Sequence, residues 1–338
     1  MSQCTQRACM PKILDGKALA NEVRKRVKEN IKSTQAKVPD YKPRLAVVQV
    51  GTREDSSVYL RMKQRAAKET GIGFTLEQLP ESISEQELLN RVRELNEDSK
   101  VHGMIVQMPL PPHINETTVI EAIDYHKDVD GFHALNVGKM AKRSTTPLFL
   151  PCTPKGIIEL LKANKISLSG KNAVVVGRSD IVGFPVAALL SAEDATVTIC
   201  HSKTENIKSV INKADVLVVA IGQPEFIKGE WIKPGAVVID VGINSVTDTS
   251  KASGKRLVGD VEYETASKVA GAITPVPGGV GPMTVAMLME NTMISANRAL
   301  EHRNECQTVC EERLQPLFSF NLFSKKFLIS TSKEVHKK

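Results

Sequence analysis

The first half of the chain alternates short, unbroken apolar runs with longer segments whose apolar residues recur at helical spacing. The apolar runs predict strands at 44–50, 74–79 and 103–108, and the segments between them predict helices at 55–71, 84–98 and 116–123. Apolar strands that alternate with helices are typical of a parallel sheet covered on both faces.

A second series of elements follows a proline-containing segment, 148–156, which predicts a domain boundary. Thr153 and Pro154 there predict the N-cap and first residue of a helix. Further Val- and Ile-rich runs predict strands at 173–176, 195–200, 215–220, 236–241 and 257–261, and a last helix, 283–300, is expected to return to the first domain.

These patterns predict an α/β protein with two α/β domains and a cleft between them. The expected domains are 11–150 plus 285–303, which would bind the substrate, and 151–284, which would be Rossmann-like. We expect residues 304–338 to form a disordered tail, although its Phe-rich end could instead dock onto a partner.

Composition narrows the class of function. The 338 residues include 45 Lys and Arg against 38 Asp and Glu, a net charge of +7, and only 4% are aromatic. No basic block is interleaved with aromatic residues and no apolar run could cross a bilayer, so neither nucleic acid nor membrane is an expected partner. The modest basic excess suits small anionic ligands, and an ordinary solvated surface explains it equally well.

The cysteines and the N-terminal region predict a compartment. The six cysteines are scattered without paired spacing, which indicates a reducing environment and no metal site. Glu22 and Glu29 argue against a mitochondrial presequence, so we expect a cytoplasmic protein.

A glycine-containing loop follows the predicted strand 173–176. Gly177 would allow a tight turn, and Gly183 would let the next helix start close by and offer its free N–H groups to a pyrophosphate. The alternative is an ordinary Gly-rich turn. The next predicted strand, 195–200, is followed by His201, Ser202 and Lys203, with no acidic residue. Ser202 and Arg178 could therefore hold a 2′-phosphate, which favours NADP over NAD. Ser202 could also simply cap a helix.

Four polar residues of the first domain would meet at the carboxyl ends of its strands. Tyr59 and Lys63 lie four residues apart on one face of a predicted helix, Gln107 ends a strand, and Asp130 belongs to an acidic turn. Taken alone, each has a plain explanation as a surface lysine, a capping residue or a turn residue.

Five segments together resemble the methylenetetrahydrofolate dehydrogenase/methenyltetrahydrofolate cyclohydrolase family: YLRMK at 59–63, VQMPL at 106–110, KDVDG at 127–131, GRS at 177–179 and PVPGGVGPMT at 275–284. The resemblance runs from about Ile13 to about Leu300. HSKT at 201–204 is most similar to the NADP-using eukaryotic branch, whose members form the N-terminal portion of cytoplasmic C1-tetrahydrofolate synthase.

The resemblance implies two reactions. A hydride would pass from 5,10-methylenetetrahydrofolate to NADP+, giving a stabilised methenyl cation, so positioning does most of the work. Tyr59 would stack on the aminobenzoate ring, Asp130 would bind the pterin, and Pro275 and Gly279 would bring backbone close to the ligands. Lys63, with a lowered pKa and held by Gln107, would then activate the water that opens the methenyl ring to 10-formyltetrahydrofolate.

The resemblance also implies a cofactor site, a homodimer formed through the second domain, and tetrahydrofolate derivatives as ligands, with polyglutamylated forms among the candidates.

Asp180 departs from the family, whose loop is commonly basic there; the acid could weaken NADP binding or point into solvent. Without a P-loop, no formate ligase activity is expected. The rival hypotheses are a dehydrogenase that has lost the hydrolytic step and a non-catalytic NADP-binding scaffold. The implied cofactor-binding residues are Gly177, Arg178, Ser179, Gly183, Ser202, Ile243 and Thr284.

Overall fold

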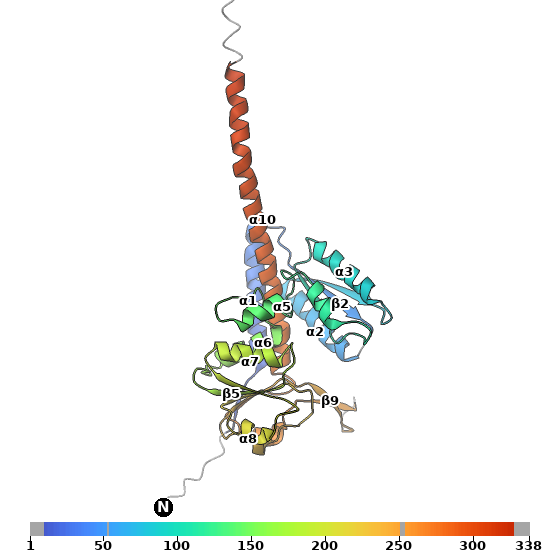
Figure 1. Ribbon diagram of the computed structural model, residues 1–338, viewed down its shortest axis with the longest axis vertical. Helices are drawn as coiled ribbons and strands as arrows, with labels where there is room; N and C mark the ends of the chain where they lie inside the picture. The colour runs from blue at the N-terminus through green and yellow to red at the C-terminus, as the bar shows by residue number, and fades with distance from the viewer. Residues whose placement is uncertain (1–9, 53, 251–253, 328–338) are drawn as a thin grey trace, which may run out of the picture. The chain divides into compact units, whose positions relative to one another are not determined.

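The computed structural model describes residues 10–52, 54–250 and 254–327, with only the backbone of 54–58 and 306–327. Contacts divide the chain into a unit that ends at Ser295 and a second unit that begins at Ala296. Two parallel sheets belong to the first unit (Figure 1).

The smaller sheet has β2 (Arg44–Val50) between β3 (Gly73–Leu79) and β4 (Gly103–Val106). Six of the seven β2 residues are buried. One face packs in a single apolar cluster with α3 (Glu85–Glu97) and α4 (Glu116–Ala122). Together with α2 (Glu54–Thr70), these elements confirm the predicted strands and helices to within two residues.

The larger sheet has six parallel strands in the order β1-β11-β8-β7-β5-β6. The predicted strands 173–176, 195–200, 215–220 and 236–241 are confirmed as β5, β6, β7 and β8. The chain leaves β5 for β6 on one side and reaches β7 on the other, so the order reverses at β5, where such sheets bind nucleotides. The strands are β1 (Lys12–Ile13), β5 (Asn172–Val176), β6 (Thr196–Cys200), β7 (Val216–Val219), β8 (Val237–Asp240) and β11 (Ala272–Ile273).

Two expectations about this half of the chain are wrong. The run 257–261 does not join the large sheet: β10 (Lys255–Val258) pairs antiparallel with β9 (Asn244–Thr247), and three of the four β10 residues are exposed. The next helix, α6 (Cys152–Ala163), is capped at Pro151 instead of Thr153. Thr153 uses its hydroxyl in a 2.9 Å hydrogen bond with Thr284.

The remaining helices are α1 (Gly16–Lys37), α5 (Ala134–Ala141), α7 (Gly183–Ala192), α8 (Ile207–Ile211), the 3-10 turn η1 (Gly229–Trp231), α9 (Tyr263–Ala266) and α10 (Val280–Phe327). Within the first unit, α10 is buried on nearly every side, as expected for a helix enclosed by other elements. No helix of the described residues is both long and apolar enough to cross a membrane.

Helix α10 continues past its predicted end through residues 304–327, where irregular structure is expected. The stretch after Leu300 is rich in Glu, Gln and Arg, which favour helix. Residues 328–338 lie outside the described residues. The predicted disorder of the whole tail and the predicted domain boundaries therefore stay predictions.

The N-terminus of α1 docks on the loop that precedes α10. The Lys17 N–H donates to the Gly278 carbonyl oxygen over 2.9 Å. A Cβ atom at Gly16 would lie 1.8 Å from the carbonyl oxygen of Gly279. The loop and the helix can approach this closely only because residue 16 has no side chain.

We therefore expect Gly16→Ala to lower the free energy of unfolding by about 1–3 kcal/mol, because either the loop or the helix must move. Gly138→Ala is the matched control. Gly138 lies exposed within α5, and an added Cβ meets nothing within 4 Å, so this variant should gain up to about 1 kcal/mol. Urea denaturation measures both, and equal stabilities would contradict the close approach.

Candidate active site

Lys63 and Gln107 form the centre of the candidate site. Lys63 lies on α2 and is 9% exposed, and Gln107 directly follows β4. Lys63 Nζ donates to Gln107 Oε1 over 2.9 Å. Gln107 Nε2 donates to the Met108 carbonyl oxygen, also over 2.9 Å, and this bond orients the amide so that its oxygen faces the lysine. The structure thus brings together two residues that the sequence places 44 positions apart.

Burial of Lys63 lowers its pKa, and the nearby charge of Asp130 raises it in part. Burial raises the pKa of Asp130, which the charge of Lys63 lowers in part. Within the described residues the two groups form no ion pair within 4 Å. The site therefore favours an uncharged amine more than water does, and it keeps the acidic side chain of Asp130 nearby.

Asp128, the other acid of this turn, holds the backbone. It is buried and accepts hydrogen bonds from the N–H groups of Gly131, Phe132 and His133 and from Asn136 Nδ2, over 2.8–3.2 Å. Burial raises the pKa of Asp128 to about 6. Asp128 thus shapes the turn, and Asp130 is left to face the lysine.

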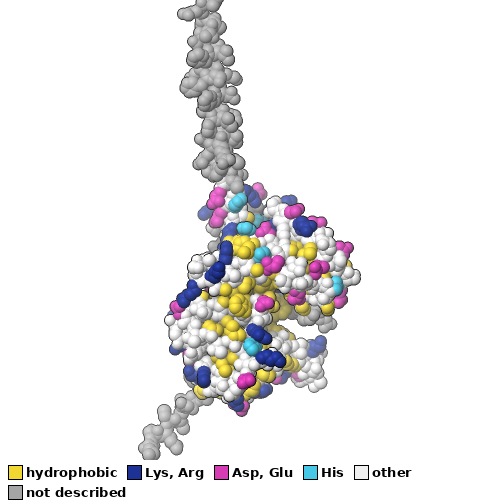
Figure 2. Space-filling view, viewed as in Figure 1, with side chains coloured by type: hydrophobic (Ala, Val, Ile, Leu, Met, Phe, Trp, Pro, Cys, Tyr) yellow, Lys and Arg dark blue, Asp and Glu magenta, His cyan; other side chains and the backbone are white. Residues whose placement is uncertain are grey.

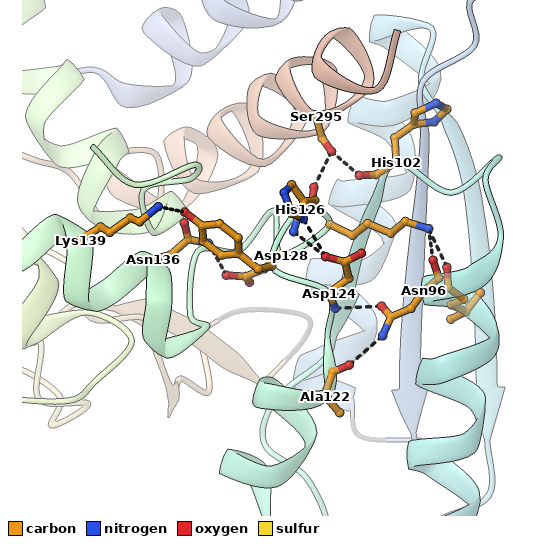
Figure 3. A network of polar contacts seen from close by, with 12 residues as sticks. Asn96, His102, Ala122, Asp124, His126, Asp128, Asn136, Lys139 and Ser295 are labelled. Carbon is orange, nitrogen blue, oxygen red and sulfur yellow. Dashed lines mark hydrogen bonds and ion pairs between the residues drawn. The ribbon is translucent and has the colours of Figure 1, made fainter. Parts of the chain in front are cut away.

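A polar network anchors the chain leading into that turn (Figure 3). Asn96 accepts from the Asp124 N–H over 2.9 Å and donates to the Ala122 carbonyl oxygen over 2.7 Å. Ser295 Oγ, on α10, lies 2.5 Å and 2.9 Å from the carbonyl oxygens of His102 and His126. The turn is therefore fixed to α3 and α10 at once.

The glycine loop after β5 has the geometry expected of a dinucleotide site. Gly177 has a φ of 124°, and a Cβ there would lie 2.2 Å from the Ala220 carbonyl oxygen at the end of β7. A Cβ at Gly183, the first residue of α7, would lie 2.4 Å from the carbonyl oxygen of Gly177. Ser179 Oγ accepts from the Gly183 N–H over 3.3 Å. The helix can start this close to the strand because both positions are glycine.

A cavity of about 370 Å³ opens beside this loop. Arg178 and Ser202 both line it and both are exposed, and no acidic residue belongs to its described lining. Asp180 is exposed and lies outside that lining. Figure 2 shows a hollow between the two lobes of the molecule, with basic side chains beside it on the lower lobe. The structure thus places Arg178 and Ser202 where one anion could contact both.

The two halves of the site meet at Gly281. A Cβ atom at this position would lie 3.2 Å from Ile243 Cδ1 and 3.7 Å from the Tyr59 hydroxyl oxygen. Burial raises the pKa of Tyr59, so its phenol stays neutral. Tyr59 comes from the helix after β2, and Ile243 comes from the loop after β8. A candidate folate-binding residue and a candidate cofactor-binding residue therefore border one cleft.

Family models match most of the chain. The catalytic-domain model of the tetrahydrofolate dehydrogenase/cyclohydrolase family matches residues 14–130, and its NAD(P)-binding-domain model matches residues 151–300. The chain belongs to this family. Its second half is therefore the family's NAD(P)-binding domain, and the predicted fold class is confirmed.

Three relatives define the likeness. The chain is 55% identical to bifunctional protein FolD 2 of Arabidopsis thaliana, over 85% of this chain and 96% of the relative. It is 57% identical to the mitochondrial C-1-tetrahydrofolate synthase of Schizosaccharomyces pombe, over 85% of this chain but only 29% of the relative, so it spans less than a third of that protein. The crystal structure of Trypanosoma brucei FolD with NADP cofactor and inhibitor has a TM-score of 0.84 and 41% identity, covering 86% of this chain and 99% of that one.

The remaining predicted site residues lie around the same cleft. Pro275 and Gly279 belong to the loop before α10, and a Cβ at Gly279 would lie 2.7 Å from the carbonyl oxygen of Pro275. Gly279 is thus required by packing within the protein, whatever it does toward a ligand. Thr284 shares its hydroxyl with Thr153 and with the Val280 carbonyl oxygen. The ligand contacts of all these residues stay predictions.

The sequence analysis did not identify the residues that anchor the backbone next to Asp130. Asn291, 1% exposed on α10, donates to the carbonyl oxygens of Val129 and Leu150 over 2.9 Å and 3.1 Å. Lys155 donates to its amide oxygen over 2.9 Å. Burial raises the pKa of Cys152 well above its usual value, so its thiol stays protonated beside Asp130. A polar Asn within the apolar part of the last helix was the available signal.

Two buried aspartates on the cofactor side were also missed. Asp240, at the end of β8, accepts from the N–H groups of Gly242, Asp260 and Val261 over 2.9–3.0 Å, and burial raises its pKa to about 7. Asp260 accepts from the N–H groups of Ile221 and Gly222. These bonds tie together the loops that follow β7 and β8 and so shape the crevice.

Proposed function

We propose that this chain oxidises 5,10-methylenetetrahydrofolate to 5,10-methenyltetrahydrofolate with NADP+ and hydrolyses the product to 10-formyltetrahydrofolate. The observation that carries the proposal is the buried Lys63–Gln107 pair beside Asp130, in a cleft that also borders a dinucleotide loop. The Arabidopsis thaliana relative, matched over 96% of its length, is named a bifunctional protein. The family whose model matches this chain is named for both activities, dehydrogenase and cyclohydrolase.

The dinucleotide site fits NADP. The close approaches at Gly177 and Gly183 bring the N-terminus of α7 next to the end of β5, although the N–H groups of Gly183 and Phe184 already donate to Ser179. The positive end of the helix dipole still favours a pyrophosphate there, and Arg178 and Ser202 could bind a 2′-phosphate. When bound, NADP+ supplies the nicotinamide ring that accepts the hydride. Because the oxidised substrate is a stabilised cation, the protein need not move a proton in this step. Tyr59, Asp130 and the 275–279 backbone would hold the folate in position.

Hydrolysis does need a base. Water adds to the methenyl carbon and releases a proton, which neutral Lys63 Nζ can accept; a proton returns when the ring C–N bond breaks. Burial makes the neutral amine accessible, and Gln107 Oε1, an acceptor, fixes one N–H so that the lone pair can face the water. Asp130 limits how far the pKa of Lys63 falls.

We expect Lys63→Met to reduce methenyl hydrolysis by about 100-fold or more while NADPH formation persists, since only hydrolysis needs the base. The wild-type hydrolysis rate should rise with pH and level off below 10.5, the ordinary pKa of lysine, because the pKa of Lys63 is lowered and the neutral form is active. Methenyl absorbance and NADPH formation measure the two steps. The exposed Lys213→Met is the control, and normal hydrolysis by Lys63→Met would contradict the role.

We expect Arg178→Ala to raise the KM for NADP+ by about tenfold or more and to leave the KM for NAD+ unchanged, because only the 2′-phosphate loses a charge-assisted hydrogen bond. Arg143→Ala, which removes an exposed arginine paired with Asp194, is the control. Steady-state kinetics with both cofactors decides. An equal rise in the KM values for NADP+ and NAD+ would contradict a contact between Arg178 and the 2′-phosphate.

We propose that two copies associate through the second domain. Strand β6 ends the large sheet, and its outer residues Thr196, Thr198 and Ile199 are exposed, which leaves an open edge for pairing. Sedimentation equilibrium should give twice the chain mass of 36.9 kDa, and Ile199→Lys should shift it toward the monomer. A monomeric wild type would contradict the proposal.

We also propose the cytoplasm as the compartment. Relatives of similar identity are named cytoplasmic in Saccharomyces cerevisiae, mitochondrial in Schizosaccharomyces pombe and chloroplastic in Arabidopsis thaliana, so the family alone does not decide. The acidic residues of α1 support the proposal. Imaging of the tagged full chain tests it, and a mitochondrial signal would contradict it.

A further inference from the structure

Asp260 is a buried acid that the proposed reactions do not use. It is 0% exposed, and no Lys, Arg or His of the described residues lies within ion-pair distance of its carboxylate. A buried carboxyl group without a cation destabilises a fold unless hydrogen-bond donors surround it. The donors around Asp260 therefore identify the parts of the protein that it holds.

These donors come from two loops at the carboxyl ends of neighbouring strands. Asp260 Oδ2 accepts from the N–H groups of Ile221 and Gly222 over 2.7 Å and 3.0 Å, in the loop after β7. Asp260 Oδ1 accepts from Asn244 Nδ2 over 2.9 Å, where the loop after β8 ends. Because β7 and β8 pair side by side in the large sheet, one carboxylate links the two loops.

The two loops border the candidate cofactor site at different places. Ile221 lines the cavity beside the glycine loop, where a 2′-phosphate could bind. Ile243 directly precedes Asn244 and is 38% exposed, and a Cβ atom at Gly281 would lie 3.2 Å from its Cδ1. The separation of the two loops therefore decides whether both ends of one dinucleotide are held in their places at once.

Asp260 is itself fixed in position. The β9–β10 hairpin pairs Asn244 with Val258, which returns the chain to the end of β8 two residues before Asp260. The Asp260 N–H then donates to Asp240 Oδ1 over 2.9 Å. A Cβ atom at Gly242 would lie 2.2 Å from Asp260 Oδ1, so the loop after β8 approaches this closely only because residue 242 is glycine. The link between the loops is therefore rigid.

We propose that Asp260 is a positioning residue for the dehydrogenase step, because it fixes the separation of the 221–222 and 242–244 loops and thereby the place of the bound cofactor. This inference rests on the proposed function. Asp260 is too deeply buried to contact a ligand itself, so it acts through the two loops. Lys63 and Gln107 lie outside both loops, so the hydrolytic step should not depend on this link.

The first test is Asp260→Ala in the full chain, which removes the acceptor for both loops. We expect the KM values for NADP+ and NAD+ to rise together by about tenfold or more, since the two cofactors differ only in the 2′-phosphate. The dissociation constant of NADP+, measured by titration calorimetry without folate, should rise by a similar factor, and supplied methenyltetrahydrofolate should be hydrolysed at the wild-type rate. Glu264→Ala, which removes an exposed acid four residues further along the chain, is the control.

Asn244→Ala tests the same link from the other loop. It removes only the hydrogen bond from Asn244 Nδ2, so both KM values should rise by about threefold. In combination with Asp260→Ala it should add nothing further, because both changes break one link. This milder variant also decides the case in which Asp260→Ala does not fold, and unchanged KM values for Asn244→Ala would then overturn the inference.

Three results with Asp260→Ala would overturn the inference. An equal loss of NADPH formation and methenyl hydrolysis would show a general structural role, unchanged KM values would show that the link is not needed, and a rise for NADP+ alone would place the effect at the 2′-phosphate. Failure of the proposed function is distinguishable. If the wild type binds NADP+ but does not oxidise 5,10-methylenetetrahydrofolate, calorimetry with Asp260→Ala still decides the inference, whereas a wild type that bound no NADP+ would overturn both.

Discussion

The burial of one amine beside one carboxylate is the constraint on which the rest of this structure depends. An isolated ammonium is costly to bury, and the protein offsets that cost with the Gln107 oxygen and with the charge of Asp130. Because burial pushes the pKa of Lys63 down and Asp130 pulls it up, small shifts of the acidic turn would change the amine's protonation. The turn accordingly has an unusual number of supports.

Those supports converge on α10. Asn291 holds the carbonyl oxygens of Val129 and Leu150, and Ser295 holds those of His102 and His126. Near its start, the same helix places Gly281 between Tyr59 and Ile243. A hydride transfer requires the donor carbon and the nicotinamide to be held at a defined separation. One buried helix that contacts both sides of the cleft provides that separation.

On the cofactor side, close backbone approaches and buried acids shape the crevice. Around Gly177 the backbone itself approaches, and the buried Asp240 and Asp260 keep the neighbouring loops in place by accepting their N–H groups. This arrangement suits a ligand that must be held in one orientation.

The sequence by itself determined most of the longer strands and helices and the residue types that the candidate site contains. The bounds of β2 match the apolar run 44–50, and Lys63, Gln107 and Arg178 lie where the sequence places them, on a helix face, after a strand and after a glycine turn. Position alone left Lys63 and Gln107 with plain structural explanations, and the resemblance of five segments to a known family marked them as site residues. Tertiary structure alone decided the contacts made across long separations. Asn291 reaches Val129 over 162 positions, β1 joins a sheet otherwise formed after residue 171, and the run 257–261 leaves that sheet. Local spacing reports which face of an element is apolar, but the partner of a buried polar group depends on which distant segment packs against it.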